Sequence, residues 1–136
     1  MNLLNKIKEH EGFKPSVYQC SQGFDTIGYG FAVKDLEIDE DIAELILMRK
    51  IDKLQKRISS TFSWWIDSDQ AIKDVVTNMC YQLGVLGFSK FKKTIYYLET
   101  EQYEEASFEM LDSLWAKQTP NRAKELSEEV RALSSN

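Results

Sequence analysis

In the stretch EHEGFKPSVYQCSQGFDTIGYGF, residues 9–31, a helical pattern ends and a strand pattern begins. Before Gly12, apolar residues and one glutamate recur at helical spacing: Leu3, Leu4, Ile7 and Glu11. This spacing predicts a helix over residues 2–11, with Gly12 as its stop. Glu11 therefore lies at the carboxyl end of a helix, in line with its apolar stripe.

From Val17 to Val33 the composition changes to tyrosine, valine, isoleucine and phenylalanine, interrupted by glycines. The segment Ser21-Gln22-Gly23 is typical of a turn. Together these features predict a hairpin or a small three-stranded sheet. Two closely spaced glycines in TIGYG also indicate a backbone that another group approaches closely.

The rest of the chain is predicted to be helical. A long helix is expected over about 39–58, with a buried stripe of Ile42, Leu45, Ile46, Leu54 and Ile58. The segment SDQAIKDVVTNMCYQLG has the widest apolar face, formed by Ala71, Ile72, Val75, Val76, Met79, Cys80 and Leu83, and ends at Gly84. Shorter helices are expected over about 89–99, 101–114 and 120–133, the last with Thr119 as N-cap and Pro120 in its first turn.

Composition excludes several classes of protein. At 136 residues, with 43% hydrophobic residues, the chain fits one domain with an ample core. A net charge of −5 without a basic stripe argues against a nucleic-acid partner. One histidine and two distant cysteines provide neither a zinc site nor a disulfide framework, so no metal or cofactor is implied. The charged N-terminus lacks the apolar core of a signal peptide, and we expect the protein to begin in a cytoplasm.

Three residues of the opening stretch are candidates for chemistry. Glu11 is placed where partial burial and a helix C-terminus both favour a protonated carboxyl, the form that a general acid requires. Taken singly, Cys20 and Thr26 fit a small semi-buried side chain and an ordinary strand residue. Alternation along the strand directs Asp25 away from Thr26, and His10 is expected to be partly exposed beside Glu11.

Taken together, these residues resemble glycoside hydrolase family 24, the T-even-phage type of lysozyme. The family signature is a Glu, eight residues, an Asp or Cys, five residues and a Thr, which Glu11, Cys20 and Thr26 match, with Thr26 opening the segment TIGYG. Far downstream, CYQLGVLGFSKFKKTI resembles the family's core helix and glycine loop. The segment WAKQTPNRAKELSEEVRAL resembles its C-terminal tryptophan and helix start. The resemblance covers nearly the whole chain.

The resemblance implies an α+β, lysozyme-like fold with two lobes in a single domain, 1–136. The N-terminal lobe, about 1–38, would hold the first helix and the sheet. A connecting helix at about 39–58 would lead to a mainly helical C-terminal lobe at about 59–136. A peptidoglycan strand would bind between the lobes.

The resemblance also assigns roles to residues. Glu11 would be the general acid, and Cys20 and Thr26 would place or activate the attacking water. Arg122 would pair with Glu11, while Gly28 and Gly30 would support the substrate cleft. Three features depart from the best-known members: Cys20 replaces an Asp, Phe31 replaces a His, and the segment after Val33 is short.

The sequence thus predicts a phage endolysin, a muramidase that cuts the MurNAc-β-1,4-GlcNAc linkage of bacterial peptidoglycan. It is expected to be a monomer without membrane insertion, and to accumulate in the host bacterial cytoplasm until a holin permeabilises the membrane. Two alternatives stay open. A lytic transglycosylase would use Glu11 as its sole acid and base, and a non-catalytic wall-binding module would keep the cleft without the chemistry.

Overall fold

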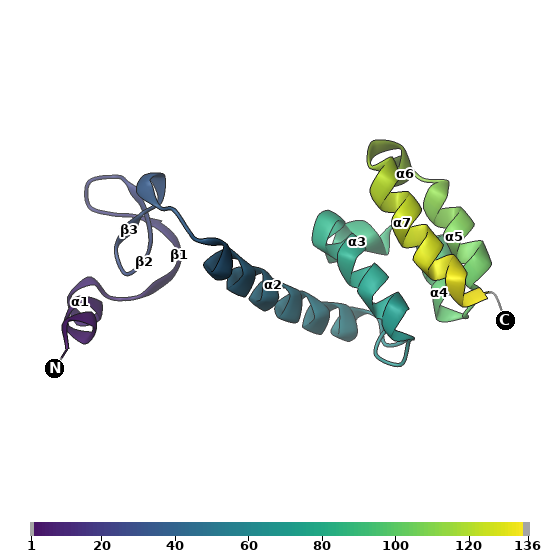
Figure 1. Ribbon diagram of the computed structural model, residues 1–136, viewed down its shortest axis with the longest axis horizontal. Coiled ribbons are helices and arrows are strands. Elements are labelled where there is room, and N and C mark those ends of the chain that lie inside the picture. The colour runs from purple at the N-terminus through teal and green to yellow at the C-terminus, as the bar shows by residue number, and fades with distance from the viewer. Residues whose placement is uncertain (1, 135–136) are drawn as a thin grey trace. The chain divides into compact units, whose positions relative to one another are not determined.

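The computed structural model describes residues 2–134 and divides the chain into two compact units, up to Glu44 and from Leu45 onward. We call them the N-terminal unit and the helical unit. The expected fold class is confirmed, because a small antiparallel sheet follows the first helix and the remainder is helical (Figure 1). No helix within residues 2–134 combines the length and apolar character needed to cross a membrane.

The N-terminal unit begins with helix α1, Leu3–Glu11. Its start is capped by Asn2, whose side chain accepts a hydrogen bond from Asn5 N at 2.8 Å. Its end is set by Gly12, which has φ +72° and donates its N–H to the Lys8 carbonyl at 2.9 Å. This left-handed conformation favours glycine, so the predicted stop is confirmed.

Three antiparallel strands follow in the order β1-β2-β3. They are β1 (Lys14–Gln19), β2 (Asp25–Gly28) and β3 (Phe31–Ala32), and a 3₁₀ turn, η1 (Val33–Asp35), comes next. Pro15 lies in β1, an edge strand where its missing N–H is tolerated, and the β1–β2 register is irregular between Lys14 and Tyr18. Thr26 is the only buried residue within residues 2–44, so this unit has almost no apolar core.

The helical unit is built from α3 (Gln70–Ser89), α4 (Lys92–Glu99), α5 (Tyr103–Leu111), α6 (Leu114–Gln118), α7 (Pro120–Arg131) and the 3₁₀ turn η2 (Ala132–Ser134). Helix α2, Glu40–Thr61, crosses the boundary between the units. The apolar face predicted for α3 is largely confirmed, since Ile72, Val75, Val76, Met79 and Cys80 are buried. A chain of aromatic contacts extends this core from Phe62 through Phe88 and Phe91 to Trp115.

Four details differ from the sequence prediction. Gly84 leaves the helical conformation at φ +78° and ψ 158°, but α3 resumes beyond it to Ser89. The helix expected over 101–114 breaks at Asp112, because Ser113 caps a separate helix by accepting a hydrogen bond from Ala116 N at 3.1 Å. Thr119 begins α7 without a capping bond, since its hydroxyl donates to the Trp115 carbonyl.

The fourth difference concerns α2. Its predicted buried stripe was wrong for Ile42, Leu45 and Ile46, which are 43%, 54% and 42% exposed. Only Ile58 of α2 is buried, and Leu54 packs against the core. The apolar stripe of α2 therefore finds packing partners only in the C-terminal half of the helix.

The ring of Phe88 offers a direct test of the helical core. Phe88 is fully buried and packs edge-on against Phe62, with ring centroids 5.6 Å apart. Phe88→Ala should lower the free energy of unfolding by about 3–5 kcal/mol, because it leaves a cavity. Urea unfolding followed by circular dichroism measures this loss.

The matched control is Leu86→Ala, on the same helix, where the side chain is 74% exposed. This change should alter stability by less than about 0.5 kcal/mol. Equal losses for the two variants would contradict the assignment of Phe88 to the packed core.

Candidate active site

The carboxyl group of Glu11 lies against the backbone of Gly30. A Cβ built on Gly30 would collide with Glu11 Oε2 and would lie 3.1 Å from Glu11 Cδ. Gly30 also has φ +76°, a conformation that favours glycine. The close approach predicted for TIGYG is therefore found, and the approaching group at Gly30 is the candidate acid itself. Glu11 is exposed, and no residue of α1 is buried, so the partial burial expected for Glu11 is not seen.

Cys20 lies in the turn that joins β1 to β2. The turn is closed by two backbone hydrogen bonds, from Cys20 N to the Phe24 carbonyl at 2.9 Å and from Gly23 N to the Cys20 carbonyl at 2.8 Å. Hydrogen bonding by the backbone N–H groups of Gln22 and then Phe24 lowers the pKa of the Cys20 thiol. Donors near one atom stabilise its anionic form, so the turn increases the thiolate fraction.

Thr26 lies in the central strand β2 and is only 6% exposed. Its hydroxyl donates a hydrogen bond to the Phe24 carbonyl at 3.0 Å. The hydroxyl is also close enough to Cys20 to lower the thiol pKa. Because a hydroxyl has a single proton, and that proton is donated to Phe24, the two backbone N–H groups carry most of the effect on Cys20.

The structure thus places Glu11 with Gly30, and Cys20 with Thr26, in the same N-terminal unit. Asp25 and His10 are both exposed. No group of three or more metal-ligating side chains occurs within residues 2–134.

Arg122 belongs to the helical unit, where it lies in the first turn of α7. Its Nε donates to Asn78 Oδ1 at 2.8 Å and its Nη2 donates to the Asn78 carbonyl at 3.2 Å. Within residues 2–134, Nη1 makes no hydrogen bond to the protein. Asn78 therefore orients the guanidinium and leaves one amino group for another partner. The sequence reasoning missed Asn78, because the two residues are 44 positions apart and no short-range pattern links them.

Arg122 and Asn78 line a groove of about 350 Å³ between α2, α3 and α7. Its other lining residues include Ile51, Thr77 and Tyr81, together with one carboxylate, Asp74. The pairing of Arg122 with Glu11 stays a prediction.

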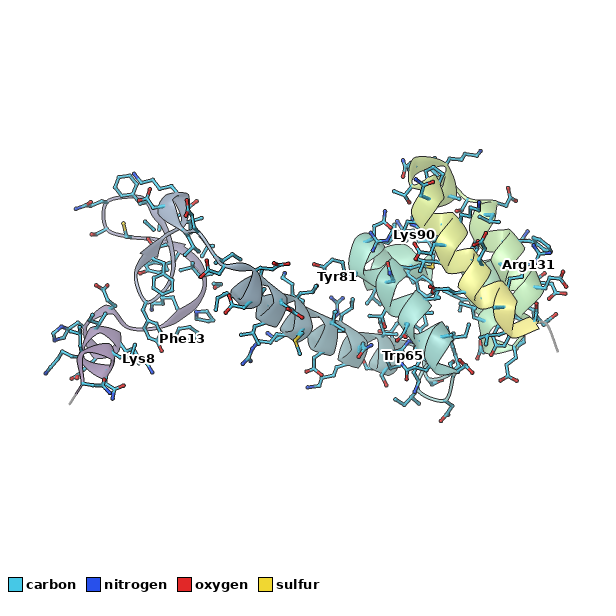
Figure 2. The ribbon with its side chains drawn as sticks, in the orientation of Figure 1. Lys8, Phe13, Trp65, Tyr81, Lys90 and Arg131 are labelled. Atoms are coloured by element: carbon cyan, nitrogen blue, oxygen red, sulfur yellow. The ribbon has the colours of Figure 1, made fainter. Side chains whose placement is uncertain are left out.

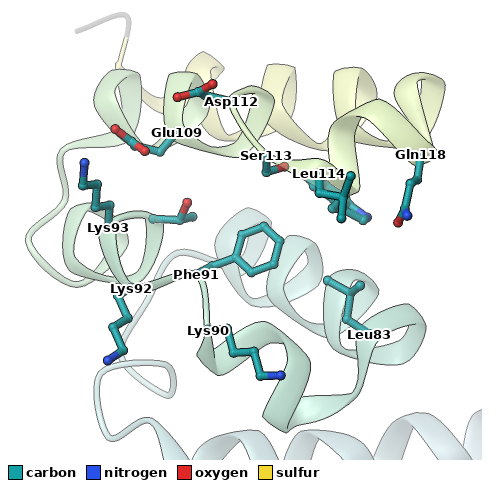
Figure 3. Close-up of a pocket in the computed structure, with 12 residues that line it drawn as sticks. Leu83, Lys90, Phe91, Lys92, Lys93, Glu109, Asp112, Ser113, Leu114 and Gln118 are labelled. Atoms are coloured by element: carbon teal, nitrogen blue, oxygen red, sulfur yellow. The ribbon is translucent and has the colours of Figure 1, made fainter.

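A second groove, of about 490 Å³, lies elsewhere in the helical unit (Figure 3). Lys90, Lys92 and Lys93 line one side and Glu109 and Asp112 the other, as Figure 3 shows. The remaining lining is largely apolar: Leu83, Phe91, Leu114 and Trp115. Trp115 is fixed by a hydrogen bond from its Nε1 to Gln82 Oε1 at 2.9 Å. Such a groove can hold an extended ligand that carries both amino and carboxylate groups.

Comparisons with known proteins agree with this architecture. The family described as phage lysozyme matches residues 8–131. Probable T4-type lysozyme 2 and probable T4-type lysozyme 1 of Dictyostelium discoideum are 28% and 26% identical, and each alignment covers 90% of this chain and 89% of the relative. The pre-baseplate central spike protein Gp5 of Enterobacteria phage T4 is 24% identical over 90% of this chain, but only 26% of the spike protein is covered.

The alignment with probable T4-type lysozyme 2 spans 152 residues, more than the 136 residues of this chain. That relative therefore contains residues with no counterpart here. The family match spans most of the chain and includes Glu11, Cys20, Thr26 and Arg122. The chain belongs to the phage lysozyme family, the hydrolases of bacterial peptidoglycan.

Proposed function

We propose that the protein is a muramidase that hydrolyses the MurNAc-β-1,4-GlcNAc linkage, with Glu11 as general acid and Cys20 and Thr26 acting on water. The observation that carries this proposal is the joint placement of the three groups on one small unit. The Glu11 carboxyl is held over Gly30, and the Cys20 thiol lies beside Thr26 in a turn that favours its anion.

In this reaction Glu11 donates its proton to the glycosidic oxygen as the bond to C1 of MurNAc breaks. Water adds to C1 from the opposite face and loses a proton to the Cys20 thiolate. The products are a new reducing MurNAc end and a free GlcNAc 4-hydroxyl, so atoms and charge balance.

Thr26 would orient the attacking water. Its hydroxyl proton is already donated to the Phe24 carbonyl, so Oγ1 is left as an acceptor. A water molecule that donates one proton to Oγ1 and the other to the Cys20 sulfur would direct an oxygen lone pair toward C1. In inverting enzymes the second carboxylate does this work from roughly 6.5–9.5 Å away from the acid.

Arg122 would meet the Glu11 carboxylate once the proton has been given up. The preorganised guanidinium would then stabilise the charge that appears on Glu11. Asn78 supports this role, because three hydrogen bonds to it fix the Arg122 side chain.

The biological setting is also part of the proposal. We place the protein as a phage or prophage endolysin that acts as a monomer. It would accumulate in the host cytoplasm and reach the wall after a holin permeabilises the membrane. Expression with and without a co-expressed holin tests this route, because lysis without holin would contradict it.

Fragment analysis tests the reaction class. Purified peptidoglycan digested by the protein should yield new reducing ends, detected by mass spectrometry after borohydride reduction. Fragments with 1,6-anhydro ends would instead indicate a transglycosylase that uses Glu11 alone. Intact sacculi would contradict both enzymatic proposals and favour a wall-binding module.

Glu11→Gln should abolish hydrolysis, because the amide has no proton of suitable acidity to donate to the leaving oxygen. General acid catalysis contributes about 100- to 10,000-fold, so the loss should be of at least that size. The assay is reducing-end release from soluble peptidoglycan fragments. Glu9→Gln is the matched control, since Glu9 is exposed on the same helix and should be replaceable without effect.

Cys20→Ser should reduce the rate about 100-fold, because a serine hydroxyl does not ionise near neutral pH and cannot accept the proton from water. Cys20→Asp should keep activity, since it supplies the carboxylate usual at this position. Both rates come from the same assay. Unchanged hydrolysis by Cys20→Ser would refute a role for the sulfur.

The two thiols should differ in reactivity at neutral pH. Turn N–H groups lower the pKa of Cys20, whereas burial raises the pKa of Cys80 to about 12. Because the thiolate is the reactive form, iodoacetamide should modify Cys20 first, and activity should fall in step. Peptide mass mapping over time measures both sites in one sample, and equal modification rates would contradict the assigned environments.

A further inference from the structure

The ring of Phe31 folds back over the turn between β2 and β3. Ile27 pairs with Phe31 in the sheet, Gly28 ends β2, and Tyr29 and Gly30 form the turn that leads to β3. A Cβ built on Gly28 would lie 2.7 Å from Phe31 Cδ2 and Cε2, so the ring rests directly on the Gly28 backbone. Gly28 also has φ +71°. One face of the turn is therefore occupied by the Phe31 ring.

Tyr29, at the tip of the same turn, joins it to the end of α1. Its ring lies 6.5 Å from the Phe31 ring in an edge-on arrangement and 5.5 Å from the Phe13 ring. The Lys8 ammonium lies 5.6 Å from the centre of the Tyr29 ring. Figure 2 labels Lys8 on α1 and Phe13 just beyond the end of that helix. Such ring and cation contacts favour this arrangement of the rings.

These contacts involve residues close in sequence to the candidate acid or to the glycine that it touches. Lys8 is three residues before Glu11 and Phe13 is two residues after it, while Gly30 beneath the carboxyl immediately precedes Phe31. The N-terminal unit has a single buried side chain within residues 2–44, so apolar burial does little to fix α1 against the sheet. The aromatic cluster of Phe13, Tyr29 and Phe31 is the main packing contact at this point.

We propose that Phe31 is a positioning residue for hydrolysis. It fixes the turn of Tyr29 and Gly30 by packing on Gly28 and Tyr29, and through Gly30 it fixes where the Glu11 carboxyl lies. The inference rests on the proposed role of Glu11 as general acid. Phe31 stands where the best-known family members have a histidine, so in this chain ring packing holds the turn without a titratable group at that position.

The test compares kcat and KM of full-chain variants on soluble peptidoglycan oligomers. Phe31→Ala should lower kcat about 10- to 100-fold with KM within about twofold, because small displacements of a catalytic group cost rate rather than binding. Phe31→Tyr should restore kcat, since the ring is retained and its edge is 47% exposed. Gly28→Ala keeps the ring but displaces it, and should lower kcat in the same way.

Phe108→Ala is the matched control, because this ring is 50% exposed and lies 5.0 Å from the Arg131 guanidinium carbon in the helical unit. Its kcat should equal that of the wild type. A kcat for Phe31→Ala within about twofold of wild type, or an equal loss in Phe108→Ala, would overturn the proposal.

A second measurement separates this proposal from the proposed function. The side-chain carboxyl carbon of Glu11, assigned by its absence from Glu11→Gln, should shift in ¹³C spectra of Phe31→Ala but keep its wild-type position in Phe31→Tyr and Phe108→Ala. Wild-type hydrolysis by Glu11→Gln would remove the general-acid role. The Glu11 resonance would still show whether Phe31 positions the carboxyl, and an unmoved resonance in Phe31→Ala would overturn that positioning.

Discussion

The proposed site depends on the contact between the Glu11 carboxyl and the Gly30 backbone. No side chain could be added at Gly30 without moving the carboxyl, and the left-handed conformation there favours glycine for a separate reason. The end of α1 and the turn between β2 and β3 are consequently joined at one point. The conformation of this turn and the position of the Glu11 carboxyl therefore depend on the same contact.

The two units are stabilised by different kinds of interaction. The helical unit buries a continuous apolar core, so its grooves are formed by helices whose positions are fixed by packing. The N-terminal unit buries only Thr26 within residues 2–44 and depends on strand pairing, turn hydrogen bonds and ring contacts. Elements with little buried apolar area have low local stability, and binding sites are often drawn from such regions. The candidate residues Glu11, Cys20 and Thr26 all lie in this unit.

The structural features that were predicted correctly from the sequence are local ones. The helix ending at Gly12, the turn at Ser21-Gln22-Gly23 and the apolar face of α3 all follow from spacing and turn chemistry within a few residues. The misses came from long-range packing. The stripe of α2 extends beyond the packing partners available to it, and the Asn78–Arg122 contact joins segments 44 residues apart. The break at Asp112 was missed because a capping serine within a helical pattern is a weak signal when only the sequence is read.

The replacement of Asp by Cys at position 20 changes the chemistry that the turn must provide. A carboxylate is ionised at neutral pH without help, whereas a thiol with an unperturbed pKa of about 8.5 is mostly neutral there. The backbone N–H groups of Gln22 and Phe24 compensate in part, because they lower the pKa of Cys20 and raise the thiolate fraction. Since the thiolate forms as pH rises, the fraction of Cys20 that can act as a base increases toward alkaline pH. The backbone of a single turn thereby supplies part of what the missing carboxylate would have provided.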